Sequence, residues 1–303
     1  MHSFAYKVKS ELCRPHVQRA CCARAEAYGV LLYCNTFNMQ EVRIITENLE
    51  FASRLPRLFK RAFDLRFDRL PDEGEHRGKL VFQITQPEKL EKIVNQLGYD
   101  MRQNLVLHVN FGILEDECCR TSFLRGAFLA GGSVTDPEKR YHLELTTSHV
   151  QASREMSALL TEMGFLPRNV MRGGNSVTYF KQCEHIEDLL TTIGAPAAAV
   201  EMMTTKLEKE LVNNANRAMN CDMANVNKTL DAAQEQCDAI EILRDAGRLE
   251  LLPKQIQETA LLRLQHPELS LGQLAERCMP PVTKSCINHR MRKIMEIARD
   301  LDE

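Results

Sequence analysis

The sequence predicts an α+β protein in which a pseudo-symmetric domain of two repeats is followed by an all-α domain. The first observation is an internal match: residues 21–37 and 118–134 each begin with paired cysteines and are rich in small and apolar residues. Further matches follow in the same order, down to the last helix of each repeat. The third observation is that residues 197–246 contain no proline and carry apolar stripes at helical spacing. Chance similarity between two unrelated segments is the alternative to a true repeat.

These observations divide the 303 residues into four parts. The first repeat covers residues 1–98 and the second covers residues 99–196, each with the element order αββαββα. Residues 197–247 form a helical linker, and residues 248–303 form a small all-α domain. We expect the linker to consist of two helices, because the asparagine-rich residues 213–229 favour a break near residues 221–225.

The two matching stretches predict a pair of central helices, at about residues 17–33 and 118–134. Gly126 and Ala130 are separated by four residues, so they share one helical face that lets another helix approach backbone to backbone. The glycines at positions 131 and 132 should stop the second helix. The first helix carries Tyr33 where the second has Ala130, and we expect it to pack less closely there.

The remaining elements of the repeats follow from periodicity and turn residues. In the first repeat we expect a short helix or strand at residues 3–12, a strand at 38–46 and a helix at 47–63. A hairpin of residues 65–70 and 80–85 around the polar residues 71–79 and a closing helix at 87–97 follow. In the second we expect a strand at residues 141–147 and a helix at 148–163 that is capped by Ser148. A hairpin of residues 166–171 and 176–181 that turns on Gly173 and Gly174, and a closing helix at 183–193, follow.

The C-terminal residues predict three helices. Residues 253–265 form the first, and residues 270–277 form a short second helix with a capping box between Ser270 and Gln273. The prolines at 280 and 281 exclude a helix there. Thr283 or Ser285 then caps a long helix that buries one apolar stripe, formed by Ile287, Met291, Ile294, Ala298 and Leu301.

A short helix, a compact turn and a longer basic helix form a helix-turn-helix pattern. Residues 284–293 contain four lysines and arginines and no acidic residue, whereas the flanking segments are acidic. Arginine and asparagine recognise base edges and lysine binds phosphate. The sequence therefore predicts a double-stranded DNA contact through Lys284, Ser285, Asn288, His289, Arg290, Arg292 and Lys293. The alternative is an ordinary three-helix bundle with a solvated basic face.

Composition sets limits on function. The formal net charge is −2, so positive charge for a nucleic acid must be local. No stretch approaches the roughly 20 apolar residues of a membrane helix, and residues 1–14 lack the apolar core of a signal peptide. We therefore expect no membrane contact, a cytoplasmic location and reduced thiols.

No catalytic signature stands out. The eleven cysteines include no CxxC pair, which argues against zinc ribbons. The pairs Cys21-Cys22 and Cys118-Cys119 occupy consecutive helical positions that face different sides, so we interpret them as small core residues. No Ser/His/Asp order, phosphate-binding loop or HExxH motif is present. We expect no enzyme activity, no metal and no cofactor.

The central stretch FLRGAFLAGGSV resembles the helix of LAGLIDADG homing endonucleases. Together with NCDMANVNKTLDAAQ and LSLGQLAERCMPPVTKSCINHRMRKI, the whole chain resembles the bacterial WhiA family of transcriptional regulators. In the nucleases, an acidic residue near the end of each central helix binds divalent metal. Alignment places Gly131 and Cys34 at those positions, and neither offers a carboxylate. The resemblance therefore implies a nuclease fold without nuclease activity.

The resemblance also implies a nucleoid-associated DNA-binding protein of the cytoplasm, tied to sporulation gene control or to cell division and chromosome segregation. Lys284, Ser285, Asn288, His289, Arg290 and Arg292 match the recognition-helix segment of the family. The strands of the first domain mix basic and acidic residues, so they show no clean basic stripe. A scaffold that binds proteins of the transcription or division machinery, with secondary DNA binding, is therefore the second hypothesis.

Overall fold

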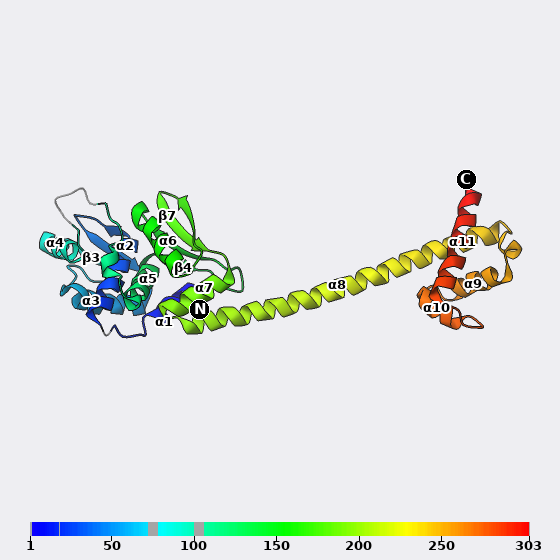
Figure 1. Cartoon of the computed structure of the whole chain (residues 1–303), viewed down its shortest axis with the longest axis horizontal. Helices are drawn as coiled ribbons and strands as arrows, with labels where there is room; N and C mark the ends of the chain where they lie inside the picture. Colours follow the sequence, from blue (N-terminus) through cyan, green and yellow to red (C-terminus); the bar gives the residue numbers. More distant parts are fainter. Residues whose placement is uncertain (1, 18, 72–77, 100–105, 303) are drawn as a thin grey trace. The chain divides into compact units, whose positions relative to one another are not determined.

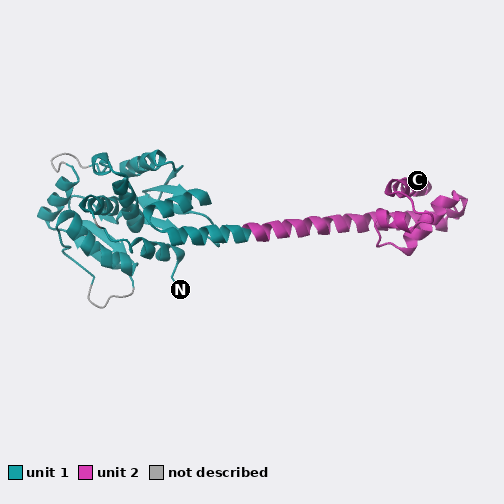
Figure 2. Ribbon diagram, turned by 60° about the horizontal axis from the view of Figure 1, so that its bottom comes forward, with its two compact units in different colours: residues 1–209 teal, residues 210–303 magenta. Residues whose placement is uncertain are grey.

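The computed structural model describes residues 2–17, 19–71, 78–99 and 106–302. It divides into two compact units, Met1–Lys209 and Glu210–Glu303, which are coloured separately in Figure 2. Each unit has its own apolar core. No helix in the described part of the chain is both long enough and apolar enough to cross a membrane.

Unit 1 contains two repeats of mixed helices and strands (Figure 1). The first repeat comprises α1 (Phe4–Leu12), α2 (Ala20–Tyr33), β1 (Thr36–Phe37), β2 (Val42–Thr46), α3 (Leu49–Phe63), β3 (Leu80–Ile84) and α4 (Pro87–Gln96). The second comprises η1 (Phe111–Ile113), α5 (Glu117–Gly131), β4 (Gly132–Val134), β5 (Leu143–Thr147), α6 (Val150–Glu162), β6 (Arg168–Arg172), β7 (Asn175–Phe180) and α7 (Cys183–Ile193). The predicted α+β class and the two-repeat arrangement are confirmed.

Each repeat forms its own antiparallel sheet. The first has the order β1-β2-β3, and the second has the order β4-β5-β7-β6. In the two central pairs, Ile44 lies opposite Phe82 and Leu145 lies opposite Thr178. Strands β2, β3 and β5 alternate buried and half-buried residues, which is the pattern of sheets with one face on the core.

The paired helices α2 and α5 form the centre of unit 1. A Cβ atom built on Gly29 would lie 2.1 Å from the backbone oxygen of Phe123, and one on Gly126 would lie 2.0 Å from that of Glu26. Only glycine therefore permits this crossing, in which backbone meets backbone. The predicted close approach is confirmed, but the looser packing expected at Tyr33 is wrong, because Gly131 of α5 leaves room for it.

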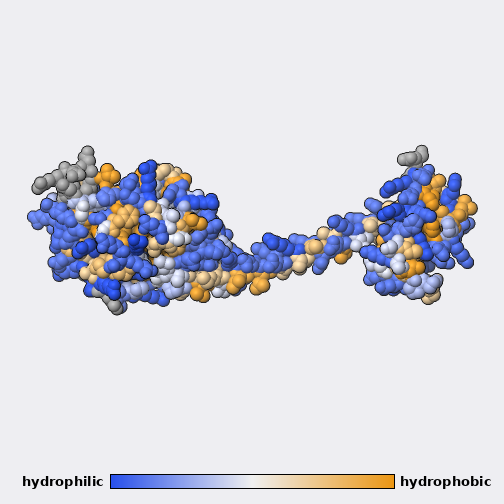
Figure 3. Space-filling model, viewed as in Figure 1, coloured by the Kyte–Doolittle hydropathy of each residue, from blue (hydrophilic) through white to orange (hydrophobic). Residues whose placement is uncertain are grey.

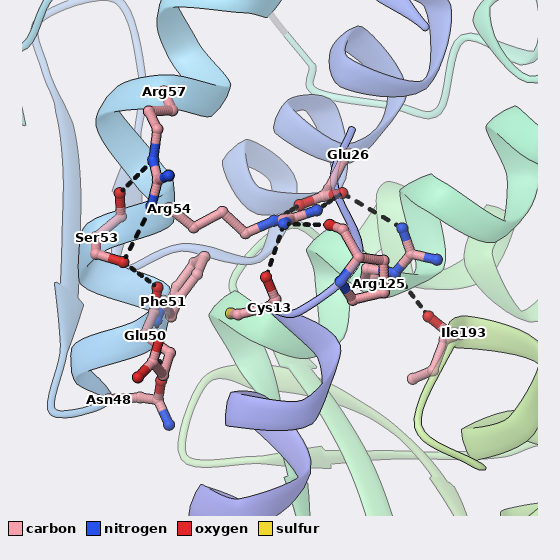
Figure 4. A network of polar contacts seen from close by, with 11 residues as sticks. Cys13, Glu26, Asn48, Glu50, Phe51, Ser53, Arg54, Arg57, Arg125 and Ile193 are labelled. Atoms are coloured by element: carbon pink, nitrogen blue, oxygen red, sulfur yellow. Dashed lines mark hydrogen bonds and ion pairs between the residues drawn. The ribbon is translucent and has the colours of Figure 1, made fainter. Parts of the chain in front are cut away.

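A buried ion-pair network fixes this helix pair (Figure 4). Glu26 of α2 is fully buried and accepts two hydrogen bonds from Arg54 of α3, at 2.6 and 2.9 Å. Its second oxygen lies 3.6 Å from Arg125 of α5. Arg54 also bonds the backbone oxygens of Cys13 and Pro15, so one carboxylate joins three helices and the α1–α2 connection.

Several expected elements differ. Residues 65–70 form no strand: only an Arg69–Gln83 bridge forms. The carboxylate of Asp68 instead accepts hydrogen bonds from the backbone of Thr85 and Gln86. Within the turn expected at 71–79, residues 72–77 lie outside the described residues. Ser148 is not the cap of α6, whose N-cap is His149. The central helix α5 ends at Gly131, as the glycines at 131 and 132 predicted, but the residues that follow form the unexpected strand β4.

The expected break in the linker is also wrong, because α8 (Pro196–Asp245) is one continuous helix. Its asparagine side chains are exposed, and no glycine or proline interrupts the helix after Pro196. Several apolar side chains of α8 are exposed, as the face in Figure 3 shows; they include Leu207, Leu211, Met219, Met223 and Leu230. The predicted domain boundaries at residues 98, 196 and 247 stay predictions.

Candidate nucleic-acid interface

Unit 2 is a helical module. It comprises the C-terminal part of α8, η2 (Leu249–Leu251), α9 (Lys254–Gln265), α10 (Leu271–Arg277) and α11 (Lys284–Asp302). Ile287, Met291, Ile294 and Ala298 of α11 are buried against Ile240 and Leu243 of α8 and Leu274 of α10. Four of the five predicted inward residues of α11 are therefore confirmed. Leu301 is 38% exposed, because it lies in the last turn beyond the core.

The turn between α10 and α11 is fixed by local hydrogen bonds. Ser270 and Gln273 form the predicted capping box at the start of α10. Val282 donates a backbone hydrogen bond to Ala275, 3.0 Å away, which folds the turn back on α10. The hydroxyl of Thr283 accepts a hydrogen bond from the backbone of Cys286 at 3.3 Å, so Thr283, one of the two predicted residues, caps α11. A short helix, a tight turn and a long helix follow one another as a helix-turn-helix requires.

The N-terminal half of α11 exposes a polar and basic face. Six of the seven predicted DNA-binding residues are exposed: Lys284, Ser285, Asn288, His289, Arg292 and Lys293. Their side chains make no hydrogen bond or ion pair with another residue in the described part of the chain. Arg292, Lys293 and Asn288 can therefore bond a ligand without first breaking an internal contact.

Arg290 differs from the other six. It is half-buried, and its guanidinium donates to the hydroxyl of Thr259 at 3.1 Å and to the side-chain oxygen of Gln255 at 3.3 Å. Both partners lie on α9. The structure therefore places Arg290 between two helices, where it orients α11 against α9.

A groove of about 360 Å³ lies beside this face within unit 2. Asn288, Arg292 and Arg299 of α11 line one side, and Gln236 of α8 lines the other. The side-chain oxygen of Gln236 is buried and has no hydrogen-bond partner among the described residues. Asn288 and Arg292 thus lie at the border between α11 and α8, which periodicity within α11 alone does not reveal.

Sequence reasoning missed Arg263, a structural residue of this module. It is 2% exposed, and its guanidinium donates to the backbone oxygen of Leu269 at 2.6 Å. It thereby closes the loop from α9 to α10. Nothing in the sequence marks it as buried, because it lies between two leucines in an ordinary helical pattern.

The C-terminal ends of α2 and α5 hold Cys34 and Gly131, the two positions that the nuclease resemblance aligns with metal-binding acidic residues. The sulfur of Cys34 lies 3.2 Å from the backbone oxygens of Leu31 and Thr36, so its single S–H donates within this pair of acceptors. Burial raises the pKa of Cys34 to about 12, so this thiol is neutral. A Cβ atom on Gly131 would lie 2.4 Å from the backbone oxygen of Thr146, so no side chain fits there.

Two arginines of the sheets already have acidic neighbours. Arg172 of β6 donates to Glu144 of β5 at 2.8 Å, and His142 lies 3.1 Å from the same carboxylate. Arg43 of β2 lies 4.0 Å from Glu41 and also contacts the hydroxyl of Thr36. These contacts agree with the absence of a clean basic stripe in the sequence.

The structure corrects the interpretation of the two cysteine pairs as small core residues. Cys119 is buried, Cys22 and Cys118 are half-buried and Cys21 is exposed. Their sulfur atoms all lie within 4.8 Å of one another. In the described part of the chain, this is the one group of three or more histidine, cysteine or acidic side chains close enough to hold a metal ion.

The fold and the site define a class of protein: a LAGLIDADG-like domain joined to a helix-turn-helix module. Sequence models support both parts, because the WhiA LAGLIDADG-like domain matches residues 120–212 and the WhiA C-terminal HTH domain matches residues 215–298.

Similar proteins extend over the whole chain. A probable cell division protein WhiA from Ruminiclostridium cellulolyticum is 35% identical, with 98% of this chain and 97% of the relative covered. One from Alkaliphilus oremlandii is 33% identical, with 99% and 98% covered. The crystal structure of full-length DUF199/WhiA from Thermatoga maritima has the same fold, with a TM-score of 0.60, 23% identity and 99% of each chain covered. The chain belongs to the WhiA family.

Proposed function

We propose that this protein is a DNA-binding transcriptional regulator that uses the N-terminal half of α11 to read double-stranded DNA. The observation that carries the proposal is the exposed face of α11, whose basic and amide side chains have no partner among the described residues. It follows the turn of a helix-turn-helix, where such motifs place their base-reading side chains. Arg292 and Asn288 are the residues that we assign to base edges, and Lys284 and Lys293 those that we assign to phosphates.

The role of the regulator in the cell is part of the proposal. Relatives that share the full length of this chain are named as probable cell division proteins. We propose that this protein acts with chromosomal DNA, in cell division and chromosome segregation or in sporulation gene control. A map of its DNA occupancy across the genome distinguishes these roles, because the first predicts sites near division genes and the second near sporulation genes.

We also propose that unit 1 does not cut DNA. Metal-dependent nucleases use carboxylate oxygens to hold divalent ions that activate water. Here the two corresponding positions hold a neutral buried thiol and a glycine with no space for a side chain. Incubation of the purified chain with plasmid DNA and Mg²⁺ or Mn²⁺ should leave the plasmid intact. Cleavage by the purified chain that is abolished by chelator and restored by added Mg²⁺ or Mn²⁺ contradicts this part of the proposal.

A scaffold role is the second candidate. It is supported by the names of the relatives and by two arginines of the sheets, Arg172 and Arg43, which already lie beside acidic side chains. Under this hypothesis the protein binds partners of the division machinery, and DNA binding is secondary.

Measurement of affinity against salt separates the two candidates. The full chain is titrated by fluorescence anisotropy onto a duplex selected from a random library and onto an unselected duplex. A regulator should bind the selected duplex about 10³-fold more tightly or better at physiological salt. For a scaffold, the ratio is near one and both affinities fall with salt to the same degree.

A further inference from the structure

Four cysteine thiols meet at one end of the central helix pair. Cys21 and Cys22 are the second and third residues of α2, and Cys118 and Cys119 are the second and third residues of α5. The two repeats thus each contribute one pair from the same position of equivalent helices. All four sulfur atoms lie within 4.8 Å of one another, and those of Cys118 and Cys119 are 4.0 Å apart.

This spacing fits a single metal ion. Four sulfur atoms that each lie about 2.3 Å from a zinc ion are separated by about 3.8 Å in a regular tetrahedron. The sulfur separations exceed this spacing by about 1 Å at most, so small side-chain movements are enough to bring the thiols around one ion. A polynuclear iron–sulfur cluster places its thiolates around several metal ions and needs them farther apart.

We propose that Cys21, Cys22, Cys118 and Cys119 form a closed tetrathiolate site that binds one Zn²⁺ ion. Thiolate sulfur is the ligand that zinc takes in structural sites with four cysteines, and four protein ligands leave no open position for a substrate. Binding displaces four thiol protons to solvent, and no electron is transferred.

The surroundings suit the negative charge of such a site. A zinc ion with four thiolates carries a net charge of −2, and the sulfurs lie in the first turns of α2 and α5, where the helix dipoles favour anions. The guanidinium of Arg19 lies 3.8 Å from the sulfur of Cys118. A groove lined by His16, Arg19, Cys22 and Cys118 reaches the cluster from solvent, so an ion has a path of entry.

The site acts by cross-linking the two repeats. The crossing of α2 and α5 is held by backbone contact at Gly29 and Gly126, and the ion would join the same two helices at their N-terminal ends. Because the site forms only when both helices are in place, zinc binding should stabilise unit 1 against unfolding.

The test measures metal content and coordination in the full chain. The protein is purified with a reductant and dialysed against metal-free buffer, and its metal content is measured by elemental mass spectrometry. We expect about one zinc ion per chain. Replacement of zinc by Co²⁺ should give the visible bands of a tetrahedral ion and an ultraviolet thiolate-to-cobalt charge-transfer band.

The variants Cys21→Ser and Cys118→Ser should lose most of the bound zinc and the charge-transfer band. The matched control Cys221→Ser, an exposed cysteine of α8, should keep both. Circular dichroism shows whether each variant is folded. Zinc added to the metal-free chain should also raise the Tm of the wild type and not that of the folded Cys21→Ser variant.

Three results overturn the proposal. The reduced wild-type chain could bind neither Zn²⁺ nor Co²⁺, or the cobalt spectrum could be the same in the wild type and in both folded variants. The chain purified with reductant could also keep disulfides among these cysteines, seen as a mass lower by two hydrogen atoms per bridge than that of the fully reduced chain, in place of a metal site.

Discussion

Arginine side chains have opposite roles in the two units. In unit 1, Arg54 and Arg125 converge on the buried carboxylate of Glu26 and join helices. In unit 2, Arg292 is exposed on α11 and has no partner among the described residues. The difference teaches that arginine content does not locate a nucleic-acid surface. What locates it is whether each guanidinium is already bonded within the protein.

The largest effect should come from breaking the buried network of unit 1. Glu26→Ala leaves Arg54 and Arg125 without their carboxylate in a buried place, and we expect a loss of about 3–5 kcal/mol in the free energy of unfolding. Urea denaturation of the full chain measures it. The control Lys7→Ala removes an exposed ion pair to Glu201 and should cost about 0.5 kcal/mol or less. Equal effects in the two variants argue against the network as the tie between the helices.

A second test concerns the crossing of α2 and α5. Gly126→Ala places a Cβ atom against the backbone of Glu26, so the helices must separate; we expect a loss of about 3 kcal/mol in the free energy of unfolding. Gly272→Ala in α10 is the control, because its Cβ atom would meet only Ser270 at 3.9 Å. That change should be neutral or stabilising by about 0.5 kcal/mol. Thermal unfolding distinguishes the two, and an unchanged Tm for Gly126→Ala contradicts the close crossing.

A smaller effect is expected at Arg290, the bonded arginine of α11. Arg290→Ala removes its hydrogen bonds to Thr259 and Gln255 and should lower the free energy of unfolding of the helical module by about 1 kcal/mol. Arg292→Ala, two residues along, should leave the unfolding curve unchanged. If both variants unfold as the wild type does, Arg290 does not orient α11.

The smallest effect is a change in salt dependence. Lys293 is assigned to phosphate, so Lys293→Ala should weaken binding to selected and random duplexes alike and lower the salt slope by about one. Anisotropy titrations across a salt series measure the slope. A loss confined to the selected duplex would assign Lys293 to a base edge and not to phosphate.

Features set by local sequence were predicted well. The capping box of Ser270 and Gln273, the turn at Gly173 and Gly174 and the apolar stripe of α11 depend on neighbours in sequence, so periodicity and cap chemistry suffice. The internal match of the central helices also predicted their crossing. The break expected in α8 was wrong because exposed asparagines lower helix propensity without ending a helix.

Features set by tertiary contact were not predicted. Glu26 lies in an alanine-rich helix, and nothing near it in sequence indicates partners on α3 and α5. The cysteine pairs were expected to face different sides, but the crossing of α2 and α5 brings all four sulfurs together. In α11, the helical pattern does not separate the bonded Arg290 from the unbonded Arg292, because that distinction depends on α9.

The central claim is that α11 reads DNA through Asn288 and Arg292, and paired alanine variants test it most directly. Arg292→Ala and Asn288→Ala are titrated onto a selected duplex, beside the control Arg248→Ala, which changes an exposed arginine before η2 that lies outside the groove. We predict that each of the first two loses about 1–3 kcal/mol of specific binding and that the control keeps the wild-type affinity. Wild-type affinity in both Arg292→Ala and Asn288→Ala would contradict the account, because it would show that this face of α11 does not contact the bases.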